Sequence, residues 1–514
     1  MSKKVLIINA HNVQKNPERK FLQGPLYLGS SLQQKGYIPK YLDLQVFKAS
    51  EMGNETHDST YDTDFVQGVI PNFVSKLMLK KSLPVTNTKD FHDLSSMNSI
   101  VTETIEKFNP DHIALSIHYS GAFLNGIEIA THIKNNFPHI TIIAGGHHVT
   151  IFAKKVLSKF AVIDYILKGE CEKTLPEFIE ALEEKSDCSH IDGLVYRDEG
   201  MVKENPKVKW IDDVDGIPFP DYSLVNLNDY EHNTENWFNP KGHVIKHSMP
   251  ILTSRSCPFK CTYCAMFLAQ GPKIRLRSPE NVVDEIQHYY NDYGQKYFSI
   301  IDDNFAFNRK RVIEICNLII KRGLDIQFDT TNGYDLNFVY DDILGALIDA
   351  GFLRSSFSIE SGHEEMRIKH MNKPLKQKRI YDAYEVLHKY KKSSQFDFTT
   401  LFVIGMPQET HETLKATKDI ILDLKLDKIA IGFAIPYPGT KLFDICENDN
   451  LFIIDPDDFL VSDIYNHEDQ VCLKPYKLDA KDITTFREGI YKDIASFKSR
   501  KYLETNKINS LVNW

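Results

Sequence analysis

The sequence predicts an α/β protein built as a doubly wound parallel-sheet domain, then a partial (β/α)6 barrel, then a small, mostly helical region. Two observations predict this order: short apolar runs alternate with helical patterns in residues 1–185, and a second, more regular series fills residues 246–450. A chain of 514 residues is also longer than one hydrophobic core usually serves. We expect residues 186–245 to link the two domains and residues 451–514 to form the C-terminal region.

In the first series, strand-like runs and helical patterns follow one another along the chain. The expected strands are 4–10, 112–119, 140–146 and 165–170, and the expected helices include 122–136 and 173–185. Strands separated by helices need crossover connections, which are typical of a Rossmann-like parallel sheet covered by helices. Residues 50–95 are polar and irregular, so we expect an insertion there. The stretch WIDDVDGIPFPDYSLV at 210–225 is acidic and contains proline, as a linker would.

The second series is longer and more evenly spaced. We expect strands at 247–255, 296–302, 325–331, 355–360, 396–404 and 428–435, and helices at 278–293, 309–322, 339–350, 375–391 and 410–424. Six such strands fall short of the eight of a closed barrel, so the barrel should be partial. Ligands of such sheets bind where the strands end. Residues 480–504 read as one amphipathic helix.

Charge and hydropathy exclude several classes of partner. The net charge of −9 argues against a nucleic acid, whose phosphates need a basic surface. No apolar run approaches the roughly 20 residues of a membrane-spanning helix, and the start MSKKVLIINA lacks the long apolar region of a signal peptide. We therefore expect a cytoplasmic protein with a small-molecule substrate and no membrane span.

The segment SRSCPFKCTYCAM crowds three of the eight cysteines into one short loop. Cys257, Cys261 and Cys264 follow a predicted strand, while the other five are scattered singly. In a reducing compartment, clustered thiols bind metal more often than they pair with one another. Three thiolates on a cubic iron–sulfur cluster leave one iron open, and an open iron can bind a small molecule. We therefore expect a metal centre with these three ligands.

A zinc site is the alternative for the same cysteines. Structural zinc usually takes four ligands in two separated pairs, and the chain has no second cysteine pair. His243 or His247 would have to complete such a site.

The pattern Cys257-x3-Cys261-x-Tyr263-Cys264 resembles the radical S-adenosylmethionine (SAM) superfamily. The resemblance implies a [4Fe-4S] cluster on the cysteines, with SAM bound to the open iron. It also implies an electron donor such as flavodoxin or ferredoxin, because one-electron reduction cleaves SAM to a 5′-deoxyadenosyl radical.

Polar side chains follow the next strands of the predicted barrel, in SIIDDNFAFN, DTTNGYDLN and SFSIESG. The resemblance implies that four side chains contact SAM: Tyr263, Asp302, Asn332 and Glu360. For Asp302, Asn332 or Glu360 alone, a capping or turn role is equally compatible with the sequence.

Small residues end the strands of the first domain, and there they let a ligand approach the backbone. The segment from 110 to 182 resembles the cobalamin-binding domain of a large radical SAM subgroup. That resemblance implies cobalamin contacts at Ser116, Ser120, Gly145, Gly146, Gly169 and Glu170. Tight turns are the alternative role for the glycines.

The Asp-x-His-x-x-Gly motif, which supplies a histidine to cobalt in methionine synthase, is absent. The resemblance therefore implies cobalamin bound without a histidine from that loop. We expect His147 and His148 to contact the cofactor's periphery or to occupy turn positions. The lower face of the cobalt is assigned only to the loop 16–29, with no residue chosen.

Together these features predict a cobalamin-dependent radical SAM enzyme. The predicted reaction is methylation of an unactivated carbon of a small molecule, through methylcobalamin and the 5′-deoxyadenosyl radical. A cyclase, a ring-rearranging enzyme or an oxidoreductase that uses cobalamin without methyl transfer is the alternative, and a non-catalytic cobalamin sensor or carrier is an alternative of another class. A methylthiotransferase would need a second cysteine triad, and no cysteine precedes Cys171. The sequence identifies no residue that acts on the substrate.

Overall fold

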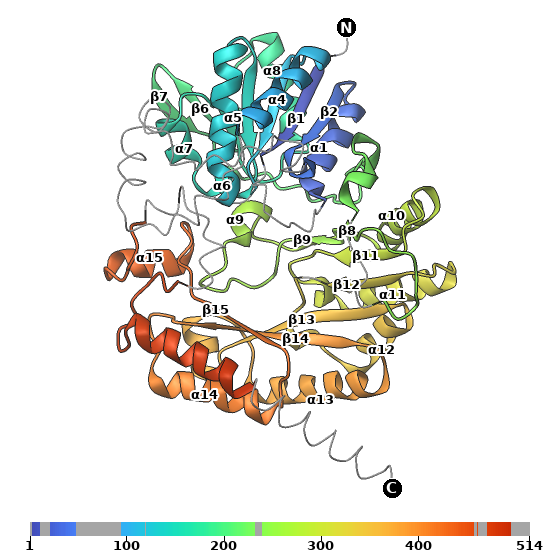
Figure 1. Cartoon of the computed structure of the whole chain (residues 1–514), viewed down its shortest axis with the longest axis vertical. Coiled ribbons are helices and arrows are strands. Elements are labelled where there is room, and N and C mark those ends of the chain that lie inside the picture. The colour runs from blue at the N-terminus through green and yellow to red at the C-terminus, as the bar shows by residue number, and fades with distance from the viewer. Residues whose placement is uncertain are drawn as a thin grey trace. The chain divides into compact units, whose positions relative to one another are not determined.

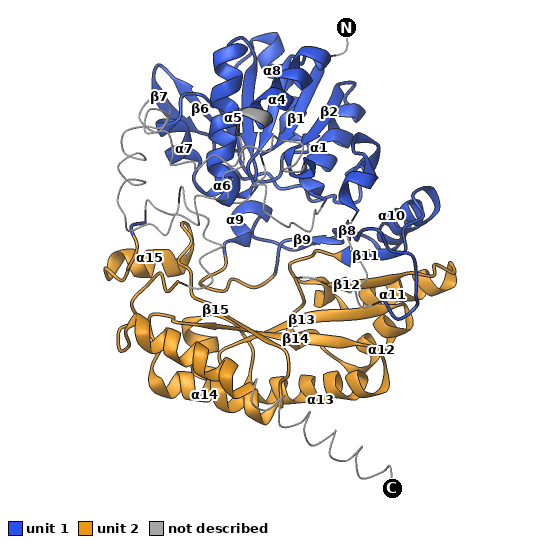
Figure 2. Ribbon diagram, viewed as in Figure 1, with its two compact units in different colours: residues 1–257, 265–299, 455–466 blue, residues 258–264, 300–454, 467–514 orange. Residues whose placement is uncertain are grey.

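The computed structural model describes residues 3–10, 21–47, 94–118, 120–231, 239–330, 332–456, 460 and 470–494. The chain divides into two compact units, which Figure 2 distinguishes by colour. The first comprises 1–257, 265–299 and 455–466, and the second comprises 258–264, 300–454 and 467–514. The insertion expected at 50–95 lies outside the described residues except for its last two, and so does the end of the helix expected at 480–504.

A seven-stranded sheet forms the centre of the first unit, with the order β2-β1-β3-β4-β5-β6-β7 (Figure 1). Its strands are β1 (Lys4–Asn9), β2 (Ile38–Asp43), β3 (His112–Ser116), β4 (Thr141–Gly145), β5 (Tyr165–Leu167), β6 (Leu194–Asp198) and β7 (Met201–Glu204). The first five strands run parallel to one another, β6 pairs antiparallel with β5, and β7 pairs antiparallel with β6. The connection after β1 leads to β2 on one side, and the connection after β3 leads to β4 on the other side. Ligands of such sheets bind in the crevice at this change of direction, between β1 and β3.

Helices join these strands, as the sequence predicts. They are α1 (Gln23–Gln34), α4 (Leu94–Phe108), α5 (Phe123–Asn136), α6 (His147–Ile151), α7 (Ala153–Lys159) and α8 (Thr174–Glu184). The apolar run of β1, Val5 to Ile8, is wholly buried, as expected for a parallel strand covered on both faces. The predicted doubly wound α/β domain is thereby confirmed.

The region expected as a linker contributes to this unit. β6 and β7, which lie within the region 186–245 expected as a linker, extend the sheet. Farther along, Tyr230 is buried and its hydroxyl donates to Asp43 Oδ2 at 2.6 Å, at the carboxyl end of β2. The chain around Tyr230 is therefore packed against the sheet.

The second series alternates along the chain as predicted. Its strands are β8 (Met249–Ile251), β11 (Tyr297–Ile300), β12 (Gln327–Thr330), β13 (Phe352–Glu360), β14 (Asp397–Ile404) and β15 (Ile429–Phe433). Its helices are α10 (Pro279–Asp292), α11 (Arg309–Lys321), α12 (Asp341–Asp349), α13 (Gln377–Ser393), α14 (His411–Asp423) and α15 (Lys441–Asn448). Within the second unit, β12, β13, β14 and β15 pair in that order, all parallel.

Local capping explains where two of these helices start. Ser278 accepts a hydrogen bond from Asn281 N, and Pro279 takes the first helical position of α10, where no N–H is needed. Thr410 and Thr413 cap α14 reciprocally through their side chains and backbone amides.

A short hairpin and a helix interrupt the series near the cysteines. β9 (Ser254–Arg255) pairs antiparallel with β10 (Arg275–Leu276), and α9 (Met266–Gln270) lies between them in sequence.

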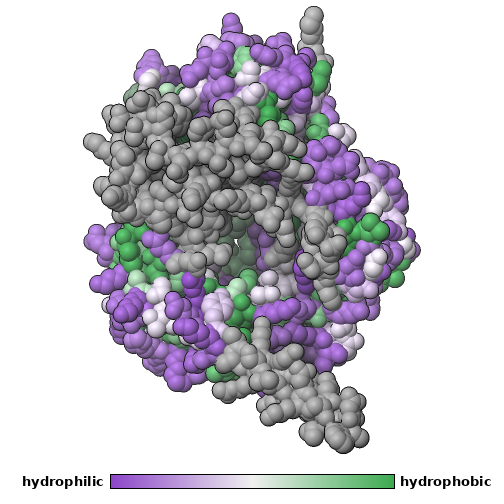
Figure 3. Space-filling model, viewed as in Figure 1, coloured by the Kyte–Doolittle hydropathy of each residue, from purple (hydrophilic) through white to green (hydrophobic). Residues whose placement is uncertain are grey.

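Hydrophilic side chains predominate among the described residues on the face drawn in Figure 3, with hydrophobic ones between them. Such a face is ordinary for a folded domain. None of the described helices is both long and apolar enough to cross a bilayer.

Candidate functional site

The cysteine loop is held in place at its centre. In the second unit, Thr262 N donates to Met371 O at 3.0 Å, its hydroxyl donates to His370 O at 2.9 Å, and its carbonyl accepts from Leu442 N at 2.9 Å. Cys264 N also donates to Cys261 O at 3.1 Å. These bonds fix the backbone between the last two cysteines, so their positions are set by the fold.

Each of the three clustered cysteines is partly buried, and none of them forms a disulfide. Soft thiolates that are neither oxidised in pairs nor sealed in the core suit an iron–sulfur cluster. The described residues contain no group of three His, Cys, Asp or Glu side chains arranged to hold a metal ion. The assignment of Cys257, Cys261 and Cys264 as metal ligands therefore stays a prediction.

Of the two histidines considered for a zinc site, His247 has other contacts. His247 is buried, its Nε2 lies 2.7 Å from Gln295 Nε2, and its ring packs edge-on against Phe21 at 5.2 Å. These contacts give His247 a structural role within the first unit.

Tyr263 and Glu360, which the sequence predicts to contact SAM, lie together in the second unit. The Tyr263 hydroxyl donates to Glu360 Oε1 at 2.8 Å, and Lys373 Nζ lies 3.2 Å from the same oxygen. Lys373 also lies 3.4 Å from Asp335 Oδ2. All three charged side chains are buried. The sequence analysis missed Lys373 and Asp335, because nothing in their local pattern shows that they meet Glu360.

Burial alone would lower the pKa of Lys373, but the Glu360 and Asp335 carboxylates outweigh it and raise that pKa above its usual value. Lys373 is therefore a cation between two carboxylates. Glu360 has a φ of +71°, in the left-handed region that only glycine adopts freely. Backbone strain of this kind is concentrated at functional sites.

The other two predicted SAM residues lie at the ends of β11 and β12. Asp302 is buried, whereas Asn332 is exposed and donates to Ile301 O at 2.9 Å, beside Asp302. Asn304 Oδ1 accepts from Asp335 N at 3.4 Å, which connects these strand ends to Lys373. The strand ends therefore share one polar region within the second unit.

Asp303 is a further acidic group in that region. Burial, together with the neighbouring Asp302 carboxylate, raises the pKa of Asp303 to about 7. Among the described residues, its Oδ2 accepts no hydrogen bond. Such a carboxyl group exchanges its proton near neutral pH.

In the first unit, the predicted cobalamin residues occupy the carboxyl ends of β3 and β4. Ser116 and Gly145 are partners in the sheet register. Gly146 has a φ of +111°, and a Cβ there would lie 2.5 Å from Ile117 O, so only glycine fits. Ser120 begins a 3-10 turn, Ser120–Ala122, and its side chain is outside the described part.

His147 and His148 belong to α6 and pack against rings. His147 lies 4.3 Å from the His118 ring, and His148 lies 4.8 Å from both Phe123 and Phe152. Burial lowers the pKa of His147 to about 4 and that of His148 to about 3. Both rings are therefore neutral at physiological pH.

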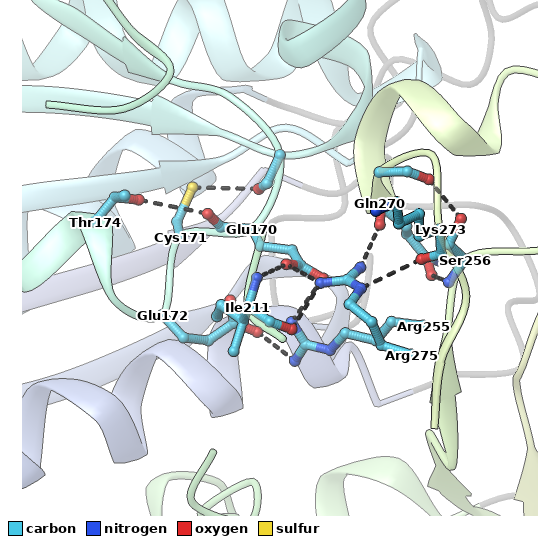
Figure 4. A network of polar contacts seen from close by, with 12 residues as sticks. Glu170, Cys171, Glu172, Thr174, Ile211, Arg255, Ser256, Gln270, Lys273 and Arg275 are labelled. Carbon is cyan, nitrogen blue, oxygen red and sulfur yellow. Dashed lines mark hydrogen bonds and ion pairs between the residues drawn. The ribbon is translucent and has the colours of Figure 1, made fainter. Parts of the chain in front are cut away.

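The remaining two predicted cobalamin residues follow β5. Gly169 has a φ of +68°. The Glu170 carboxylate is held by Arg275 at 2.6 Å and Arg255 at 3.2 Å, and it accepts from Ile211 N at 3.1 Å (Figure 4). The sequence analysis did not foresee these arginines.

Two family models match the chain. The model of the radical SAM superfamily covers residues 251–421, and that of the B12 binding domain covers residues 84–179.

Curated relatives match over most of the chain. An uncharacterized methyltransferase, PH0819 of Pyrococcus horikoshii, is 30% identical over 69% of this chain and 73% of its own length. The anaerobic magnesium-protoporphyrin IX monomethyl ester cyclase of Cereibacter sphaeroides is 26% identical over 69% of this chain, which spans 57% of that protein.

Among solved structures, the radical S-adenosylmethionine methyltransferase TsrM from Kitasatospora setae, with tryptophan substrate and a SAM analogue bound, is similar with a TM-score of 0.62 and 16% identity. The match covers 87% of this chain and 76% of that one.

Proposed function

Because the chain belongs to the cobalamin-dependent radical SAM enzymes, we propose that it transfers a methyl group to a carbon atom of a small molecule. The predictions of the family and of its cofactors, a [4Fe-4S] cluster, SAM and cobalamin, are thereby confirmed. The observation that carries the proposed reaction is the 30% identity to a methyltransferase over 69% of the chain. We propose further that the enzyme works in the cytoplasm and receives electrons from a flavodoxin or ferredoxin.

The cysteine loop would hold the cluster. Cys257, Cys261 and Cys264 lie within eight residues, are partly buried and form no disulfide. Three such sulfur donors suit an iron cluster and leave one iron for SAM. With SAM bound, the cluster would supply the electron that cleaves SAM reductively. The chain fixes the loop through the Thr262 backbone and hydroxyl.

The polar region of the second unit would hold SAM. Asp302 and Glu360 supply acceptors for the ammonium and ribose hydroxyl groups of SAM, and Asn332 supplies an amide. Lys373 and the Tyr263 hydroxyl both hold one Glu360 oxygen, which leaves the other for a ligand. The strained Glu360 backbone fixes the direction of this carboxylate.

The strand ends of the first unit would hold cobalamin, which supplies methyl-transfer chemistry at cobalt. Gly145 and Gly146 carry no side chain, so a flat ring system could approach their backbone. His147 and His148 are engaged with other rings, in agreement with cobalamin bound without a histidine from this loop.

A cyclisation is the second candidate, since the relative from Cereibacter sphaeroides is a cyclase. The two reactions differ in the fate of the SAM methyl group. A methyltransferase places it in the product, whereas a cyclase leaves it in methionine.

Reduced, reconstituted protein incubated with SAM that carries an isotopically labelled methyl group, and with a small-molecule extract of its cells, tests the proposal. Labelled product formed together with 5′-deoxyadenosine and S-adenosylhomocysteine supports methyl transfer. The appearance of 5′-deoxyadenosine without label in any product favours the cyclase. If neither nucleoside forms, a cobalamin sensor or carrier is favoured. Cys261→Ala is the control, because it should abolish SAM cleavage.

A further inference from the structure

A buried cluster of four charged side chains connects the loop after β5 to the hairpin β9–β10, wholly within the first unit. We call Glu170, Glu172, Arg255 and Arg275 the clasp. Arg255 lies 3.2 Å from Glu170 and 2.5 Å from Glu172, and Arg275 lies 2.6 Å from Glu170. Figure 4 shows both guanidinium groups directed at the two glutamates.

The clasp is closed to water and balanced in charge. The side chains of its ion pairs are at most 10% exposed, and two carboxylates face two guanidinium groups. Within a protein interior, removal of one partner leaves the other charge buried without compensation, which is strongly unfavourable. The loop and the hairpin are therefore held in one arrangement.

The segment Trp210–Ile211 is part of the same assembly. A Cβ on Gly169 would lie 3.1 Å from the Trp210 ring, and one on Gly271 would lie 2.5 Å from it, so the indole packs against both glycines. Arg275 donates to Ile211 O at 3.0 Å, and Ile211 N donates to Glu170 at 3.1 Å. Packing against Trp210 and the ion pairs of the clasp thus both join the loop after β5 to the hairpin β9–β10.

The hairpin end of the clasp leads directly to the first cysteine. Only Ser256 separates Arg255 from Cys257. Ser256 N donates to Gln270 Oε1 at 2.7 Å and its hydroxyl donates to Gly271 O, while Arg275 donates to Gln270 O. The backbone that enters the cysteine loop is therefore held by the residues that hold Arg275.

We propose that the clasp is a positioning device, which sets the entry to the cysteine loop at Cys257 relative to the Gly169 loop. Glu170 then acts through the arginines, and its carboxylate does not touch the corrin. The proposal rests on the proposed function, since it takes the Gly169 loop to border cobalamin and Cys257 to hold iron. It implies that cobalamin binding at one end orders the hairpin at the other.

Hydrogen exchange of the full-length protein, followed by mass spectrometry with and without hydroxocobalamin, tests this. Glu170→Gln keeps the size of the side chain and removes its charge, and Arg275→Met removes the guanidinium. Glu204→Gln is the matched control: Glu204 pairs with Lys168, next to Gly169, and with Lys154 at 2.9 Å, and neither lysine belongs to the hairpin. Thermal unfolding shows that each variant is folded.

In both clasp variants, amides of residues 254–257 and 266–276 should exchange about tenfold faster or more. Hydroxocobalamin should slow this exchange in the wild type and in Glu204→Gln, but not in the clasp variants. Glu170→Asp, which keeps the charge but is one methylene shorter, should fall between wild type and Glu170→Gln and is the variant to use if neither clasp variant folds.

Wild-type exchange in the folded clasp variants would overturn the proposal. Loss of hydroxocobalamin binding by Glu170→Gln with unchanged hairpin exchange would also overturn it, since Glu170 would then contact the corrin. A wild type that binds no hydroxocobalamin would instead contradict the proposed function, and the exchange measured without cofactor would still test the clasp.

Discussion

The Tyr263 hydroxyl donates a hydrogen bond to Glu360 Oε1 at 2.8 Å. This bond joins the residue before Cys264 to the last residue of β13, nearly 100 positions later in the chain. Within the second unit, this bond therefore ties the end of the cysteine loop, at Tyr263, to the predicted SAM carboxylate. Lys373 Nζ lies 3.2 Å from the same oxygen.

Replacement of Glu360 by Gln should weaken SAM binding. The amide keeps the size of the side chain but loses the charge that attracts the SAM ammonium group. We expect affinity to fall by about tenfold to about a hundredfold, since hydrogen bonds to charged groups contribute about 1.5–3 kcal/mol. Equilibrium binding of SAM to the reconstituted protein measures it. Tyr381→Phe, which removes an exposed tyrosine–carboxylate hydrogen bond to Asp423, is the control and should bind SAM normally. Unchanged affinity in Glu360→Gln would contradict the assignment.

Replacement of Lys373 by Met should destabilise the second unit. The change leaves the buried Glu360 and Asp335 carboxylates without their cation, which costs about 3–5 kcal/mol. Chemical denaturation measures the loss. Lys378→Met breaks the exposed pair with Asp382 and should have little effect. Equal stability of the two variants would show that Lys373 does not hold these carboxylates.

Glu409 should make stability depend on pH. Burial raises its pKa to about 7, although hydrogen bonds from Thr413 and Gly405 oppose the rise. Because the folded pKa exceeds the unfolded one, the folded state binds the proton more tightly, and this contribution to stability is lost as pH rises through about 7. Between about pH 5 and about pH 8, the free energy of unfolding of Glu409→Gln should therefore rise by about 3 kcal/mol relative to that of the wild type. Denaturation curves at several pH values measure this gain, and parallel pH profiles would contradict it.

Gly146→Ala should impair cobalamin binding more than its backbone strain alone explains. Alanine at a φ of +111° is strained, and its Cβ would lie 2.5 Å from Ile117 O, which must shift. We expect a loss of about 1–3 kcal/mol in stability and weaker hydroxocobalamin binding. Gly36→Ala is the matched control, because Gly36 has a φ of +83° but nothing within 4 Å of a Cβ. If Gly146→Ala and Gly36→Ala weakened hydroxocobalamin binding equally, cobalamin would not approach Gly146 closely.

Periodicity explains why much of the fold could be predicted. Runs such as Val5–Ile8 are buried on both faces and stand out as apolar. Helices of the second series such as α10, α11 and α14 bury residues at helical spacing, which marks them in the sequence. β2 was not predicted, since Ile38–Asp43 is short, contains Pro39 and Lys40, and alternates in burial at its start.

The candidate site divides in the same way. The cysteines and the strand-end carboxylates could be found from sequence because their spacing is local. Lys373 and Arg275 could not, because each meets its partner only in the folded chain: Lys373 meets Glu360 at the end of β13, and Arg275 meets Glu170, 105 positions earlier, after β5. Only the folded chain shows that these charges are paired.

The metal and corrinoid content of protein purified without oxygen and reconstituted tests most directly whether the chain holds an iron–sulfur cluster and cobalamin. We predict about four irons and four sulfides per chain, with the visible spectrum of a cubane cluster. We also predict one bound corrinoid, and loss of the cluster, but not of the corrinoid, in Cys261→Ala. Zinc in place of iron, or a chain that binds no corrinoid, would show that the assignment is wrong.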